Sequence, residues 1–185
     1  MIGFGSQMMS LNGLLPELAA DETAAVTVKD ADCGVNPGTY TFLELYCRDK
    51  KCDCQRAMIR VLSANGDWHA TLSYGWRDLK FYIAWMYGDR ETAATIPGIN
   101  LYTEQPQAHN ATNFLDIFRH MMLDPALQQR YQRHYALFKA ALKGDSPLKT
   151  ITQVDLAERR KLRRRLNLKA KYAQLPARKM LPAPN

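Results

Sequence analysis

The chain has 185 residues, of which 46% are hydrophobic, and a net charge of +7, a composition typical of a globular protein that buries a core. Its apolar runs are shorter than the ~18–20 residues that cross a bilayer. Its first residues contain neither a basic segment nor a continuous apolar one. We therefore expect no membrane span and no secretory signal. We expect a cytoplasmic location, where disulfides are uncommon.

The positive charge is concentrated at the C-terminal end of the chain. Residues 150–185 carry ten basic and two acidic side chains, a net charge of +8, so residues 1–149 carry a net charge of −1. Such asymmetry is typical of a near-neutral domain with a basic arm that meets a polyanionic partner. We predict a globular α+β metal-binding domain at 1–149 and a basic helical arm with a proline-containing tail at 150–185.

The N-terminal part of the chain predicts a short helix and then strands. Leucines spaced like one face of a helix occur before and after Pro16, which interrupts the pattern. Residues 24–29 suit a short strand, and residues 30–38 combine Asp, Gly, Asn and Pro as loops do. A second strand is expected over 39–46, because it is rich in Tyr, Thr, Phe and Leu.

The next segment predicts an antiparallel meander. Residues 48–53 are polar and suit a turn, and residues 57–63 suit the following strand. Asn65-Gly66 is typical of a tight hairpin that needs positive φ, after which residues 68–74 return as a strand. We expect three to four strands, with a cysteine-bearing hairpin tip at 48–53.

After the meander, the hydrophobic period changes to that of helices. Residues 78–87 carry apolar side chains on one helical face, and residues 91–107 resemble a loop. A helix from about residue 112 precedes another that Asp124 caps and Pro125 begins. The predicted fold class is α+β, a small antiparallel β-meander packed against about three helices and followed by the basic C-terminal helix.

Three of the four cysteines, Cys47, Cys52 and Cys54, fall within eight residues. The strand assignment places them at one hairpin tip, so their sulfurs should meet at one edge of the sheet. Zinc takes four ligands in a tetrahedron at ~2.0–2.3 Å, and thiolates on a tight turn can supply three of them. Arg48 and the neighbouring lysines are expected to lower the thiol pKa values. We predict a structural zinc site.

The fourth ligand is less clear from the sequence. Cys33 would complete a four-cysteine set, but a hairpin of the strands at 24–29 and 39–46 places it at the far end of the second strand, about 20 Å from Cys47. His69 follows a turn at the opposite edge and has the same difficulty. Our choice is His134, which shares the inward face of its predicted helix. The other histidines, His109 and His120, remain alternatives.

The cysteines also allow other chemistry. They suit three ordinary reduced thiols at a sheet edge, or a redox switch in which the Cys-x-Cys pair is oxidised. An iron–sulfur cluster would also need a fourth ligand, and a nucleophile paired with a histidine is a further alternative. The sequence has no His-Glu-x-x-His motif, no phosphate-binding loop and no cytidine-deaminase zinc motif.

One stretch of the chain is rich in aromatic residues. Such residues on a sheet face can stack bases, but they also build a core where a sheet meets a helix, and we favour the core. The spacing around Gly75 predicts tight packing there. The stretch comprises Trp68, Tyr74, Trp76, Phe81, Tyr82 and Trp85.

The basic arm is the clearest interaction feature. Six cations within seven residues exceed what solubility requires, and Arg and Lys bind phosphates with strong salt dependence. We predict contact with nucleic acid. An acidic protein surface, or a larger assembly in which the tail docks, is the alternative partner, and we expect no membrane partner. The predicted nucleic-acid-binding residues are Arg159, Arg160, Lys161, Arg163, Arg164, Arg165, Lys169 and Lys171.

Together these features favour a zinc-stabilised binding module over a catalyst. In this interpretation the metal stabilises the hairpin, and the arm supplies the binding energy. The alternative from another class is a thiol-based redox sensor, or a metal-dependent enzyme that uses the same three cysteines.

Overall fold

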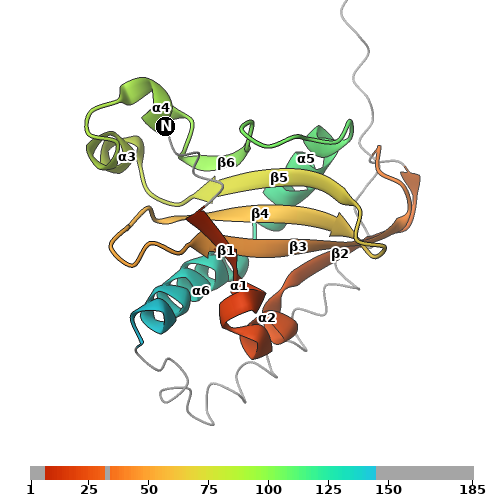
Figure 1. Ribbon diagram of the computed structural model, residues 1–185. Helices are drawn as coiled ribbons and strands as arrows, with labels where there is room; N and C mark the ends of the chain where they lie inside the picture. The colour runs from red at the N-terminus through yellow and green to blue at the C-terminus, as the bar shows by residue number, and fades with distance from the viewer. Residues whose placement is uncertain (1–6, 32–33, 145–185) are drawn as a thin grey trace, which may run out of the picture.

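The computed structural model of the protein describes residues 7–31 and 34–144. Cys33 and the whole basic arm lie outside these residues, so predictions that concern them stay predictions. The described chain combines an antiparallel sheet of six strands with six helices, which confirms the predicted α+β class (Figure 1). None of the helices in these residues is both long enough and apolar enough to cross a membrane.

The sheet contains the predicted meander and two more strands. Its order is β1-β3-β4-β5-β6, β2 also pairs with β3, and every pairing is antiparallel. The β2–β5 strands confirm the predicted ones, whereas β1 and β6 were not predicted. The strands are β1 Met8–Ser10, β2 Ala24–Val28, β3 Gly38–Cys47, β4 Arg56–Ser63, β5 Trp68–Gly75 and β6 Gly98–Leu101.

The two N-terminal strands share one edge of β3. β2 pairs with the first half of β3, up to Phe42, and β1 pairs with the last three residues, where Met8 lies opposite Cys47. Two short helices, α1 Leu11–Leu14 and α2 Pro16–Glu22, connect them. Pro16 begins α2 because a proline at the first helical position loses no hydrogen bond. The single helix expected there is therefore two.

The remaining helices are α3 Leu79–Trp85, α4 Arg90–Ala94, α5 Ala111–Met121 and α6 Pro125–Lys143. The cap predicted for α6 is present, since the Asp124 side chain accepts a hydrogen bond from the Ala126 N–H at 3.0 Å. At its other end, Gly144 adopts φ 85°, the left-handed conformation that ends many helices. The loop predicted over 91–107 is wrong in part, because it contains most of α4 and all of β6.

The main core lies between one face of the sheet and α5 and α6. Phe42 of β3 stacks on Phe118 of α5 with ring centroids 5.6 Å apart, and Tyr46 meets Phe138 of α6 at 5.4 Å. In Figure 1 α6 runs below β3 and β4, while α3 and α4 gather at the opposite side, near β6. Strand alternation places every second residue of β3 in this core.

The aromatic stretch belongs mainly to packed structure, as predicted. Tyr74 and Tyr82 are buried, whereas Trp68 is 38% exposed. Packing around Gly75 is tight, because a Cβ there would lie 2.5 Å from the Ile96 carbonyl oxygen and 2.7 Å from the Tyr82 hydroxyl. Gly75 thus lets both α3 and the residues that follow α4 lie directly on the sheet.

Candidate metal centre

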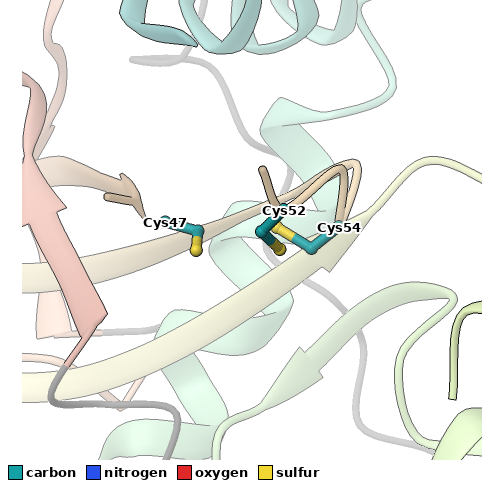
Figure 2. Close-up of side chains that lie close together, drawn as sticks. All are labelled: Cys47, Cys52 and Cys54. Carbon is teal, nitrogen blue, oxygen red and sulfur yellow. The ribbon is translucent and has the colours of Figure 1, made fainter. Parts of the chain in front are cut away.

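The three predicted cysteines meet at the tip of the β3–β4 hairpin. Cys47 is the last residue of β3, and Cys52 and Cys54 lie on the turn that leads into β4 (Figure 2). Their sulfur atoms all lie within 4.8 Å of one another, and none forms a disulfide. Sulfurs bound tetrahedrally to zinc at ~2.3 Å are about 3.8 Å apart. A small closure of the turn therefore suffices to hold an ion.

The turn that carries Cys52 is organised by its own backbone. Asp49 is central, because its carbonyl oxygen accepts a hydrogen bond from the Cys52 N–H at 3.2 Å and its carboxylate accepts one from the Lys51 N–H at 2.9 Å. Asp49 also contributes a backbone hydrogen bond to the Cys47 sulfur. Backbone N–H groups directed at a sulfur stabilise the thiolate form that metals bind.

Helix α6 supports the tip from below. The ammonium group of Lys139 donates hydrogen bonds to the carbonyl oxygens of Cys47, at 3.2 Å, and Asp49, at 2.6 Å. The Tyr135 hydroxyl, one turn earlier on the same helix, donates to the Asp53 carboxylate at 3.0 Å. Both ends of the cysteine turn are thereby attached to one rigid helix.

Gln55 anchors the end of the turn that leads into β4. It has φ 48°, a left-handed conformation that non-glycine residues rarely adopt. Its side-chain oxygen accepts a hydrogen bond from the Trp76 indole N–H at 2.7 Å, and its carbonyl oxygen accepts one from the Tyr82 hydroxyl at 2.7 Å. These bonds compensate a backbone conformation that costs of order 1–3 kcal/mol, so the residue after Cys54 is held in one position.

Hydrogen bonds among the thiols make their ionisation unequal. Bonds from Cys52 and Cys54 lower the pKa of Cys47 well below its usual range, and the charge of Lys139 adds to this effect. Hydrogen bonding to Cys47 raises the pKa of Cys52 and of Cys54. Arg56 acts in the opposite direction on Cys54. The cluster therefore releases one proton readily and holds the others, unless a cation compensates the added charge.

The structure does not place His134 with these sulfurs, so our choice of fourth ligand requires correction. Its side chain points inward from α6, as expected, and is fully buried. Nδ1 lies 2.8 Å from a carboxylate oxygen of Glu44, and Nε2 lies 3.1 Å from one of Glu22. Both ring nitrogens are thus engaged by carboxylates, and His134 belongs to a separate buried polar cluster.

The other candidates for the fourth position are not in the cysteine group either. His69 packs against Tyr40 and Phe114, with ring centroids 5.2 Å away in both cases, and His109 and His120 are exposed. Among the described residues, the only group of at least three possible metal ligands is formed by the cysteines alone. Cys33 and all eight predicted residues of the arm lie outside the described residues.

Sequence reasoning missed the residues that support the turn. Lys139 and Tyr135 are about 80 to 90 positions from the turn in sequence, and no local pattern indicates such a contact. The cations that act on Cys47 and Cys54 are Lys139 and Arg56, in place of the adjacent basic residues that we had expected.

Comparisons of the chain with protein-family models, with curated proteins and with solved structures find no match in any of the three.

Proposed function

We propose that this protein is a non-catalytic binding module whose β3–β4 hairpin is stabilised by a zinc ion on Cys47, Cys52 and Cys54. The observation that carries the proposal is the gathering of three sulfurs within 4.8 Å at one hairpin tip. Thiolates select soft or borderline ions, and zinc is the common structural choice for them. We propose that the metal replaces the mutual repulsion of three thiolates with attraction to one cation.

Burial of the cluster supports a structural role. Cys47 and Cys54 are only 5% and 1% exposed, whereas an attacking nucleophile has to reach its substrate. The surrounding contacts hold the turn in place from both α6 and Trp76, the residue that follows β5. A metal there would tie the end of β3 to the turn that leads into β4 and so stabilise the hairpin at its tip.

The partner we propose is nucleic acid, bound through the basic arm at 150–185. The support for this proposal is compositional: ten basic residues stand against two acidic ones, and phosphate contacts by such residues give sequence-independent affinity. The metal-bound domain would anchor one end of the arm and make any additional contacts with the nucleic acid. An acidic protein surface is the alternative partner, which failure of the full chain to bind RNA and DNA would favour.

Metal analysis of the purified full chain tests the zinc site. We expect about one zinc ion per chain, lost in Cys52→Ser, and a thermal unfolding midpoint that a chelator lowers in the wild type. The matched control is Cys33→Ser, which should retain the metal. Wild-type protein that contains no metal, although all of its thiols are reduced and react with a thiol reagent, would contradict the proposal.

The second candidate is a thiol-based redox sensor at the same residues. It is favoured by the lowered pKa of Cys47, because hydrogen bonds from Cys52 and Cys54 stabilise the Cys47 thiolate. The partial exposure of Cys52 also favours it. Thiolates in such an environment react with oxidants and can form a disulfide with a neighbour. Rapid alkylation of Cys52 in a metal-free chain would support this candidate.

A further inference from the structure

The cysteine cluster supplies three ligands, and zinc takes four. The chain has four histidines, all of which are described, and none belongs to the cysteine group. The segments 1–6 and 145–185 contain no histidine and no cysteine. Cys33 is thus the one remaining side chain of the usual zinc-binding nitrogen and sulfur types.

In the sequence, Cys33 falls between β2 and the Gly38 end of β3. Cys47 ends β3 nine residues after Gly38 begins it. A strand of this length spans about 30 Å. The next residue along from Cys33, Gly34, accepts a hydrogen bond from the Asn113 side chain at 2.7 Å, which attaches that connection to α5. The length of β3 therefore separates Gly34, the described neighbour of Cys33 in the chain, from the cluster.

The nearest carboxylates already serve the turn. An Asp49 carboxylate oxygen accepts the Lys51 N–H at 2.9 Å, and one of Asp53 accepts both the Gln55 amide at 2.6 Å and the Tyr135 hydroxyl. Rotating either side chain toward the sulfurs would break contacts that organise the turn. Neither carboxylate is among the ligand atoms that meet at the tip.

We infer that the fourth ligand of this metal is a thiolate from outside the 185 residues, and that a small anionic thiol fits the position. The inference rests on the zinc site proposed above. Cys52 is the most exposed of the three cysteines, so it lies on the side from which such a ligand can approach. A thiolate matches the three sulfurs already present and completes a four-sulfur set common in structural zinc sites.

The charges around the tip favour an anion. A divalent ion on three thiolates carries a net charge of −1, and the exposed turn offers three cations against two acids, with Lys139 adding another cation beside Cys47. The surroundings therefore offset part of the charge of the site and of an incoming anionic thiol. The three exposed cations of the turn are Arg48, Lys50 and Lys51.

Cobalt substitution of the full chain tests the inference, because the sulfur-to-cobalt charge-transfer absorbance grows with the number of bound thiolates. We expect glutathione, an anionic thiol, to raise this absorbance toward the four-sulfur value while about one cobalt per chain is retained. S-methylglutathione, which has the same charge but no thiol, should leave the spectrum unchanged. Cys33→Ser should behave as the wild type in both titrations.

Charge reversal adds a second measurement. The double variant Lys50→Glu with Lys51→Glu should weaken the response to glutathione more than the response to the neutral 2-mercaptoethanol. Loss of the four-coordinate cobalt spectrum in Cys33→Ser, no response to glutathione, or removal of the metal by glutathione would overturn the inference. A chain that binds no cobalt would instead overturn the zinc site itself.

Discussion

At the scale of single residues, the most heavily constrained group is a buried ionic cluster that joins α2, β3 and α6. His134 lies between the carboxylates of Glu22 and Glu44, and Arg133 pairs with Glu22. The Tyr46 hydroxyl donates a hydrogen bond to Glu44 at 2.5 Å. Because breaking a buried ion pair leaves an uncompensated charge in the core, these residues depend strongly on one another.

The pKa shifts of this cluster give a pH window for stability. Burial opposes the charged form of His134, but its hydrogen bonds to Glu22 and Glu44 outweigh burial and raise its pKa. Its contribution to stability is therefore complete below ~6.5 and is lost as pH rises through the folded-state pKa. Burial also opposes ionisation of Glu22, but His134 and Arg133 lower the pKa of Glu22 to about 2. Its contribution is complete above ~4.5 and is lost as pH falls toward about 2.

The substitution His134→Gln tests this window. We expect it to lower the free energy of unfolding by roughly 3–5 kcal/mol, because Glu22 and Glu44 lose a buried cation. We also expect the wild type to lose stability as pH rises above ~6.5, and the variant to lose most of this decline. Urea unfolding across this range measures both effects. An equal alkaline decline in the two proteins would contradict the assignment to His134.

At the scale of elements, the cysteine turn depends on α6. Lys139 donates to two carbonyl oxygens of the turn, and groups that orient metal-bearing loops commonly affect affinity as much as ligands do. The helix and the hairpin therefore act as one unit, although β3 and α6 are distant in sequence.

We predict that Lys139→Met weakens zinc binding by about 10–100-fold, because it removes both hydrogen bonds and a nearby positive charge. Competition with a chromophoric chelator measures the affinity, and circular dichroism checks that the helix remains. Lys143→Met, an exposed change at the end of the same helix, is the matched control. Equal affinities in the two variants would show that Lys139 does not support the site.

At the scale of the whole molecule, our proposal assigns the metal to the near-neutral domain and nucleic-acid binding to the basic arm. We predict that replacing Arg163, Arg164 and Arg165 with alanine weakens binding to random-sequence RNA and DNA. The slope of log affinity against log salt should fall by about 1 for each lost phosphate contact. Fluorescence anisotropy at several salt concentrations measures both quantities.

A control variant that removes the same number of charges from the domain distinguishes the effect of the arm from the effect of net charge. The exposed domain residues Lys29, Lys80 and Arg90 replaced together by alanine remove the same three charges, and this variant should keep the wild-type salt slope. If both variants bind alike, the arm has no special role. If neither the wild type nor the variants bind nucleic acid, the acidic protein partner is favoured.

The sequence alone determined the features that local chemistry controls. The meander followed from strand periodicity and the Asn65-Gly66 turn, and the caps of α6 followed from Asp124 and Pro125. The meeting of the three cysteines followed as well, because a hairpin of known register brings the ends of its two strands together. In each case the residues that decide the outcome lie within a few positions of one another.

Only the tertiary structure decided the partners of residues that are distant in sequence. β1 and β6 are short and carry little periodicity, so their place at the sheet depends on pairing with β3 and β5. The prediction that His134 points inward was correct, but the predicted partners were wrong. Helical periodicity indicates which way a side chain points and does not indicate which residues it meets. Glu22 and Glu44 reach it from α2 and β3. Burial then favours that ionic cluster, since a buried ring needs its nitrogens satisfied.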